Sequence, residues 1–181
     1  MKPLRLARTA LAVTAGTLLA LGLTAPAAGH HPEGPPQPFF AEHDDTCTFT
    51  ETKGQLSWAA THPPQPPAVN LRGQAQSANL GDCNYLVPVV PYIELQAYDL
   101  DDTADEADWE TAATAVDREV VPIPDDNPID FRAQLTPTAW IGIEPPDIDV
   151  VTVRACLTTR VHPPEDQTYD GDCGKPDVHH P

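Results

Sequence analysis

The sequence predicts an all-β protein, an antiparallel β-sandwich of the immunoglobulin-like or a similar type. Three observations support this fold class: apolar and polar residues alternate in several segments, prolines and glycines interrupt those segments, and the chain holds four cysteines. Alternation with a period of two residues is typical of strands that bury one face. Several short strands of this kind, separated by breaks, favour a sandwich.

Residues 1–28 have the organisation of a secretory signal peptide. Three basic residues precede an apolar run over residues 11–23, and small residues at 25–28 form a cleavage signal. The apolar run is shorter than the roughly 20 residues that a membrane-spanning helix needs. We therefore expect cleavage after Ala27 or Ala28 and a secreted, extracellular protein without a membrane anchor.

The charge balance excludes several kinds of partner. The 181 residues include 10 Lys and Arg against 27 Asp and Glu, which gives a net charge of −17. Cleavage of the signal peptide removes three basic residues and no acidic one, so the mature chain would carry −20. Binding of nucleic acid or of an anionic membrane requires clustered Lys and Arg side chains. We therefore expect neither as a partner.

The first part of the mature chain predicts a leader and then a hairpin. Residues 29–44 are rich in proline and histidine and are expected to be disordered. Residues 47–51 and 56–60 alternate, and Lys53-Gly54 lies between them. This pattern predicts two strands joined by a turn.

The rest of the chain predicts further strands and one ambiguous segment. Strands are expected over residues 69–76, 92–98, 129–135 and 149–161, with shorter candidates over 116–123 and 140–143. Residues 104–118 combine helix-forming Ala and Glu, so either a short helix or a loop followed by a strand fits them. The sandwich domain is expected over residues 45–174, and a flexible, histidine-containing tail over 175–181.

The four cysteines are expected to form two disulfides, because the predicted compartment is oxidising and no C-x-x-C motif is present. Three pairings of Cys47, Cys83, Cys156 and Cys173 are possible, and the sequence does not decide among them rigorously. We favour the sequential pairing, which closes loops of 36 and 17 residues. Each loop closure would stabilise the fold by roughly 3–4 kcal/mol.

Three short motifs support a family resemblance: Gly81-Asp82-Cys83, Val153-Arg154-Ala155-Cys156 and Asp172-Cys173-Gly174. With the signal peptide, the preference for Arg over Lys and the Ala- and Pro-rich composition, the chain resembles small, uncharacterised secreted two-disulfide β-sandwich proteins of high-G+C Gram-positive bacteria. The resemblance covers most of residues 45–174. It implies the fold and the compartment, and no activity.

An acidic segment that follows a predicted strand is a candidate calcium site. Seven carboxylates lie within residues 99–110, and Ca²⁺ prefers several oxygen ligands. The EF-hand pattern is not met, because Ala104 stands where the sharp turn needs glycine. The alternative is a solvated acidic loop that aids solubility. The candidate ligands are Asp99, Asp101, Asp102, Asp105 and Glu110.

Histidines near the predicted cleavage point are candidate copper or nickel ligands. His30 is the third residue of the mature chain if cleavage follows Ala27, and His31 is the third if it follows Ala28. A free amine, two amide nitrogens and an imidazole can form a square-planar site that suits Cu(II) or Ni(II). The alternative is that these histidines belong to a solvated tail.

The polar face of the strand over residues 92–98 is a candidate binding surface. Alternation places Tyr92, Glu94, Gln96 and Tyr98 in one row. Aromatic rings next to hydrogen-bonding side chains can hold a sugar or a peptide. The alternative is that the edge of one tyrosine packs beneath the proline-rich segment or the second sheet.

No catalytic motif is present, since both G-x-S-x-G and H-E-x-x-H are absent. We therefore predict a secreted, acidic, monomeric β-sandwich that is not an enzyme and needs no cofactor. It would act as a binding or interaction module for an extracellular protein, peptide or glycan. The alternative function is extracellular metal binding, of Ca²⁺ at residues 99–110 or of Cu²⁺ or Ni²⁺ at the mature N-terminus.

Overall fold

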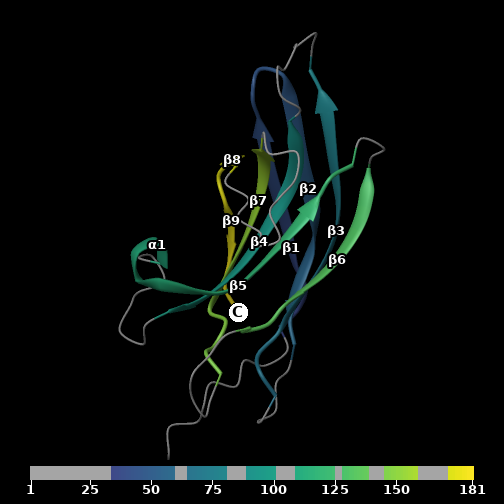
Figure 1. Cartoon of the computed structure of the whole chain (residues 1–181). Helices are drawn as coiled ribbons and strands as arrows, with labels where there is room; N and C mark the ends of the chain where they lie inside the picture. The colour runs from purple at the N-terminus through teal and green to yellow at the C-terminus, as the bar shows by residue number, and fades with distance from the viewer. Residues whose placement is uncertain are drawn as a thin grey trace, which may run out of the picture.

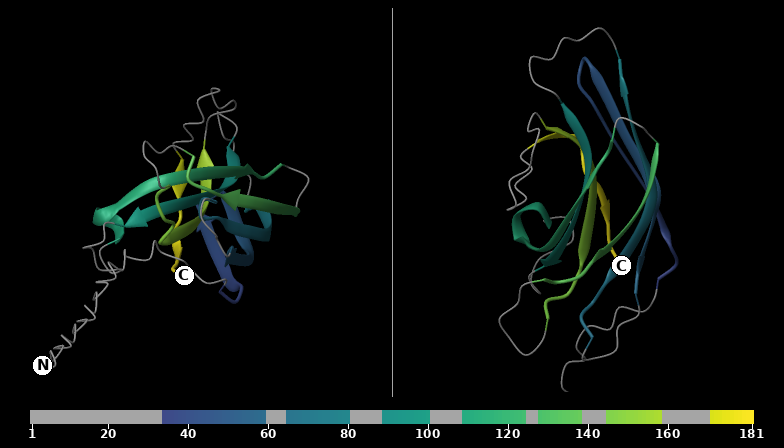
Figure 2. Two further views of the ribbon diagram at one scale, coloured as in Figure 1. Left: turned by 90° about the horizontal axis from the view of Figure 1, so that it is seen from below. Right: turned by 45° about the vertical axis from the view of Figure 1, so that its right-hand side comes forward.

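The structure, a computed structural model, describes residues 34–59, 65–80, 89–100, 109–124, 128–138, 145–158 and 171–181. Its strands form two antiparallel sheets that pack face to face, as Figures 1 and 2 show. The prediction of an all-β antiparallel sandwich is therefore confirmed. No helix within the described ranges is long and apolar enough to cross a membrane.

The first sheet has four strands in the order β1-β2-β3-β6, and the second has β5-β4-β7-β8, with β9 also paired to β7. The strands of the first sheet are β1 (Gln37–Asp44), β2 (Thr48–Trp58), β3 (Val69–Asn79) and β6 (Ile129–Leu135). Those of the second sheet are β4 (Val90–Leu100), β5 (Ala113–Pro122), β7 (Val150–Thr158), β8 (Asp172–Cys173) and β9 (Asp177–His179).

The strand order is compatible with an immunoglobulin-like sandwich that has one additional strand. The order β2-β3-β6 in the first sheet and β5-β4-β7-β8 in the second corresponds to an A-B-E sheet packed on a C′-C-F-G sheet. Strand β1 extends the first sheet at its edge, next to β2. The predicted antiparallel sandwich, of the immunoglobulin-like or a similar type, is therefore confirmed.

The core lies between the two sheets and is built from the apolar positions of the alternating segments. Trp58 connects the layers, because its indole Nε1 donates to the carbonyl of Ile148 at 3.1 Å, ahead of β7. The predicted inward faces of β4, β6 and β7 are confirmed by their burial. The largest core side chains are Phe39, Leu56, Trp58, Val69, Leu71, Ile93, Leu95, Ile123, Phe131, Leu135, Ile148, Val151 and Val153.

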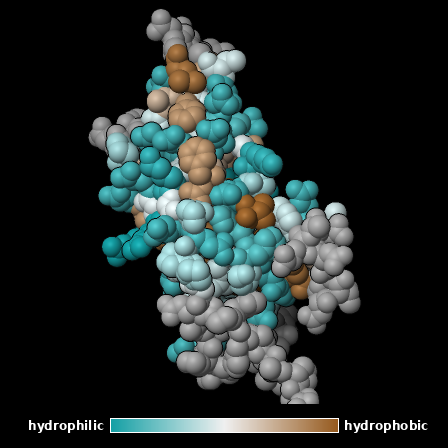
Figure 3. Space-filling model, turned by 180° about the vertical axis from the view of Figure 1, so that it is seen from behind, coloured by the Kyte–Doolittle hydropathy of each residue, from teal (hydrophilic) through white to brown (hydrophobic). Residues whose placement is uncertain are grey.

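Most of the remaining apolar surface is covered. Among the described residues, only Phe40 and Leu80 are large apolar side chains with at least half of their surface exposed, at 50% and 56%. The face seen in Figure 3 is correspondingly hydrophilic over most of its area, with its apolar side chains gathered along a line that descends from the top.

Residues 37–44 correct the prediction of a disordered leader over 29–44. They form β1, which pairs with β2 along its whole length. Phe39 and Ala41 are buried in the core, so proline at position 38 is tolerated because β1 is an edge strand of its sheet. Residues 29–33 lie outside the described part of the chain.

The predicted hairpin at Lys53-Gly54 is wrong, because β2 runs without a break from Thr48 to Trp58. Gly54 lies opposite Gly73 in the register of β2 and β3. A Cβ atom on Gly54 would lie 2.5 Å from the Phe39 ring, and one on Gly73 would lie 2.9 Å from it. Glycine is present here to give space to an aromatic ring, and not to form a turn.

The C-terminal segment corrects the prediction of a flexible tail over 175–181. Residues 177–179 form β9, and His179 is buried. The segment also covers the edge of β1, where the amide of Phe40 donates to Asp177 Oδ2 at 2.8 Å. It therefore closes one side of the sandwich.

Residues 104–118 were expected to form either a short helix or a loop followed by a strand, and the described part of this segment contains both a helical turn and a strand. Trp109–Ala112 form a single helical turn, α1, and β5 begins directly after it. Residues 101–108 lie outside the described ranges, as does the strand candidate over 140–143. The four residues of α1 contribute no buried side chain to the core.

One predicted disulfide is confirmed. Cys156 of β7 is bonded to Cys173 of β8, with a sequence separation of 17 residues. Cys47 is also disulfide-bonded, and Cys83, its partner in the sequential pairing, lies outside the described residues. The Cys156–Cys173 bond fixes the C-terminal segment to the outer side of the second sheet.

Candidate functional site

The outer face of the second sheet carries a polar pocket of about 350 Å³. Three strands and the start of the C-terminal segment contribute to it, so it lies where the predicted binding surface of β4 was expected. Its lining residues are Tyr92, Glu94, Gln96, Arg118, Arg154, Gly171 and Cys173.

The alternation of β4 determines which of its side chains reach this pocket. Ile93 and Leu95 point into the core and are fully buried, so Glu94 and Gln96 point to the other face. The register places Glu94 opposite Arg154 of β7 and Gln96 opposite Arg118 of β5. Two arginines therefore approach Glu94 from two different strands.

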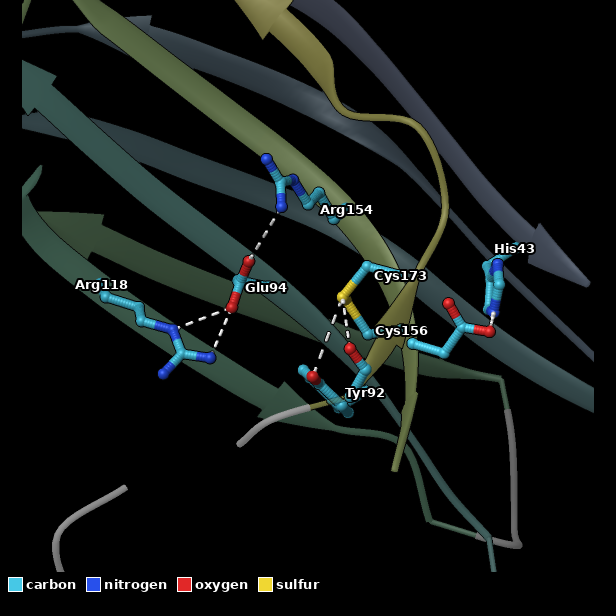
Figure 4. The surroundings of a disulfide bond; sticks show 9 residues. His43, Tyr92, Glu94, Arg118, Arg154, Cys156 and Cys173 are labelled. Carbon is cyan, nitrogen blue, oxygen red and sulfur yellow. Dashed lines mark hydrogen bonds and ion pairs between the residues drawn. A yellow bond between two sulfur atoms is a disulfide. The ribbon is translucent and has the colours of Figure 1, made fainter. Parts of the chain in front are cut away.

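Glu94 forms a close ion pair with Arg118 and a longer one with Arg154, as Figure 4 shows. Arg118 donates from Nε at 2.8 Å and from Nη2 at 2.5 Å, both to Oε2 of Glu94. The second oxygen, Oε1, lies 4.0 Å from Nη1 of Arg154. Only 9% of the Glu94 side chain is exposed. A carboxylate this deeply buried is unfavourable unless positive charges lie next to it, and the two arginines provide them.

Arg154 is incompletely satisfied. Its Nε is buried and has no hydrogen-bond partner among the described residues, although 30% of the side chain is exposed. Two guanidinium groups share one carboxylate, so the cluster carries a net charge of +1. A buried donor without a partner is unfavourable.

Tyr92 is fully buried, which corrects its predicted role in an exposed binding row. Its hydroxyl lies 3.8 Å from Cys173 Sγ, and a Cβ on Gly171 would also touch the Tyr92 ring at 2.9 Å. The physical reason is the Cys156–Cys173 disulfide, which holds residues 171–173 over this end of β4. The polar row that remains accessible consists of Gln96 and Tyr98, which are both partly exposed.

Tyr98 marks the other end of the row. Its ring packs edge-on against Trp109 of α1, with ring centroids 5.5 Å apart. Burial raises the pKa of Tyr98 above its ordinary value of 10.0, although the positive charges of Arg154 and Arg118 act in the opposite direction. The phenol is therefore neutral at physiological pH and can donate a hydrogen bond.

The predicted metal ligands are not brought together within the described part of the chain. Asp99 lies in β4 and Glu110 in α1, whereas Asp101, Asp102, Asp105, His30 and His31 lie outside the described residues. Only Glu94, Cys156 and Cys173, among residues that are described, bring three potential ligand atoms within 4.8 Å of one another. Two of those atoms are joined in the disulfide and lack the thiolate that binds metals.

Sequence reasoning predicted Glu94 and Gln96 but did not select the two arginines. The alternation of residues 149–161 did place Arg154 on the polar face of its strand, so one signal was present. Arg118 fell in the segment that was ambiguous between helix and loop. Comparisons of the chain with protein-family models, with curated proteins and with solved structures found no match.

Proposed function

We propose that this protein is a secreted, non-catalytic binding module whose pocket at Glu94, Arg118 and Arg154 receives a carboxylate of an extracellular peptide or protein. The observation that carries the proposal is the buried Nε of Arg154, which lacks a partner among the described residues. A guanidinium can bind a carboxylate through two parallel hydrogen bonds. This is the chemistry that would satisfy the site.

The neighbouring groups suit a peptide. Gln96 lines the same pocket, and its amide can both donate to and accept from a peptide group. Tyr98 follows on the same face and packs against Trp109, which adds an aromatic surface next to the charged cluster. The pocket volume of about 350 Å³ lies within the range of small-ligand pockets, about 300–1,000 Å³.

The charge of the protein limits the class of ligand. The mature chain, which would carry −20 after cleavage of the signal peptide, repels polyanions at long range, so a ligand with a single carboxylate is favoured over a strongly acidic one. Catalysis is not proposed for this site, because the carboxylate of Glu94 is engaged by Arg118 and is not free to act as a base.

The test is an NMR titration of the mature protein with N-acetyl-glycyl-glycine, which has a free carboxylate, and with its C-terminal amide. We expect the Nε–Hε signal of Arg154 to shift saturably with the acid and not with the amide. Arg154→Gln should weaken binding of the acid at least tenfold, since a charged hydrogen bond contributes roughly 1.5–3 kcal/mol.

The matched control is Lys53→Gln, which removes an exposed positive charge from the other sheet. It should leave binding of the acid unchanged. The proposal is contradicted if the Arg154 signal does not move, or if the acid and the amide shift it equally.

A further inference from the structure

A second basic site lies on the opposite sheet, where two arginines face each other. The register of β3 and β6 pairs Arg72 directly with Arg132. Their neighbours Leu71 and Ala133 are buried in the core, so both guanidinium groups extend from the outer face. Like charges directly opposite each other destabilise a sheet, and in a chain with only 10 basic residues this pair needs an explanation.

No carboxylate neutralises this pair within the described residues. Arg72 donates from Nη2 to Oε1 of Gln55 at 2.8 Å, and Arg132 makes no hydrogen bond or ion pair there. The nearest acid on this face of β6 is Asp130, whose Oδ1 accepts from Gln74 Nε2 at 3.1 Å. Two positive charges therefore stand side by side with one neutral amide as their partner.

The arginines border a pocket of about 420 Å³ on the outer face of the first sheet. Gln55, Ser57 and Asn70 line it together with both arginines. Next to them, Gln134 Nε2 donates to Oδ1 of Asn70 at 2.9 Å. Apart from the charge pair, the polar groups here are hydroxyls and amides, which form hydrogen bonds to neutral hydroxyl groups in either direction.

This chemistry favours a sugar over a peptide. Strand β3, at the centre of the pocket, is paired on both sides with β2 and β6, so its backbone is not available to add an extended peptide as a further strand. A ligand in this pocket must therefore be bound by side chains. The arginines suit one negative group on the ligand, and the neutral amides and the serine hydroxyl suit several ligand hydroxyls.

We propose that the Arg72–Arg132 pocket binds a sugar acid, in which the carboxylate lies between the two guanidinium groups and the hydroxyls contact Gln55, Ser57 and Asn70. The net charge of the protein favours a mono- or disaccharide unit with one carboxylate over a highly charged polymer. This site is separate from the pocket at Arg154, because the two lie on the outer faces of different sheets.

The test is a calorimetric and NMR titration of the mature protein with D-galacturonate and with D-galactose. We expect saturable binding of galacturonate with shifts of the Arg72 and Arg132 Nε–Hε signals, and at least tenfold weaker binding of galactose. Arg72→Gln and Arg132→Gln should each weaken galacturonate binding at least tenfold. Lys53→Gln, which removes a charge from the same face outside the pocket, should change it less than twofold.

A stability measurement separates loss of the site from loss of the fold. Removal of one of two facing positive charges should leave the thermal midpoint of Arg132→Gln at or above that of the wild type. Galacturonate should raise the midpoint of the wild type and not that of Arg132→Gln. The Arg154→Gln variant should keep its galacturonate binding, so the two sites can fail independently.

Three results would each overturn the proposal: no saturable binding of galacturonate, equal binding of galactose, or an equal loss in Lys53→Gln, which would indicate unspecific attraction of anions. A clearly lower thermal midpoint of Arg132→Gln without ligand would also overturn it, because the arginine pair would then be a structural feature.

Discussion

At the scale of single residues, Gly54 and Gly73 show how the absence of a side chain is used. Both lie in the middle of long strands, where glycine is unfavourable on entropic grounds. The two glycines leave space that the ring of Phe39 occupies. This ring also packs against that of Phe131, with the two ring centroids 6.3 Å apart. An aromatic ring across from strand glycines restores the packing that the glycines lack.

Gly54→Ala is therefore expected to destabilise the fold. The added methyl would collide with the backbone carbonyl of Arg72 and with the Phe39 ring, and overpacking of this kind costs roughly 1–3 kcal/mol or more. Chemical denaturation monitored by fluorescence measures the change. Gly34→Ala is the control, since nothing lies within 4 Å of its added Cβ; equal stability of the two variants would contradict the packing role of Gly54.

Tyr98 predicts a pH dependence with a defined sign. Its pKa is raised in the folded protein by burial, so the unfolded chain loses this proton first as the pH increases. Tyr98 therefore makes its full contribution to the free energy of unfolding below the pKa of about 10 in the unfolded chain, and this contribution is lost as the pH rises above that value. Tyr98→Phe should therefore lose less stability than the wild type between pH 9 and pH 11 in urea denaturation. Parallel decreases in the two proteins would show that Tyr98 makes no such contribution.

At the scale of elements, the first and the last strand stabilise each other. β1 lies at an edge of the first sheet, and β9 pairs with β7 of the second. Gln37 Nε2 of β1 donates to the carbonyl of His180 at 2.7 Å, and Asp177 accepts from the amide of Phe40. An unpaired edge strand invites association with another chain, and this contact covers part of the β1 edge.

Asp177→Ala should weaken this closure. Asp177 Oδ2 accepts from the Phe40 amide at 2.8 Å and lies 2.9 Å from Nε2 of His179. Loss of a charged acceptor that is one-third exposed should lower the free energy of unfolding by about 1–2 kcal/mol. Asp44→Ala, at the exposed end of β1, removes an equal charge and should lower the free energy of unfolding by less than about 0.5 kcal/mol, the usual range for surface substitutions. Similar losses in both variants would show that charge alone is responsible.

At the scale of the whole molecule, the acidic excess acts against compactness. A net charge of −17 gives self-repulsion in the folded state, while the described arginines at positions 72, 118, 132 and 154 lie within two clusters on the sheets. Because salt screens this repulsion, the free energy of unfolding is expected to increase with ionic strength.

The thermal midpoint should accordingly rise between 10 mM and 150 mM NaCl, over which the Debye length falls from about 30 Å to about 8 Å. A gain of roughly 1 kcal/mol corresponds to roughly 2–4 °C for a domain of this size. Calorimetry in NaCl and in KCl at equal ionic strength checks the effect, since screening does not depend on the cation. A midpoint that falls with salt would indicate that attractive ion pairs, such as Glu94 with Arg118, dominate over repulsion.

The alternation of residues 92–98, 129–135 and 150–158 by itself determined that these segments are strands and which of their faces enters the core, because side-chain direction in a strand is a local property. The last residues of the predicted strand over 149–161 lie outside the described part of the chain. The sequence also pointed to Glu94 and Gln96 as polar groups on an outer face. It misassigned Lys53-Gly54 as a turn and residues 37–44 as disordered, since their roles depend on partners elsewhere in the chain.

Only the tertiary structure decided which charges meet. Arg72 and Arg132 are 60 positions apart in the sequence, and their pairing follows from the register of β3 against β6. In the same way, Arg118 and Arg154 reach Glu94 only because β5 and β7 flank β4, and Tyr92 is buried because a disulfide holds the C-terminal segment over it. Strand order and register are set by packing of the whole core, and no local pattern in the sequence encodes them.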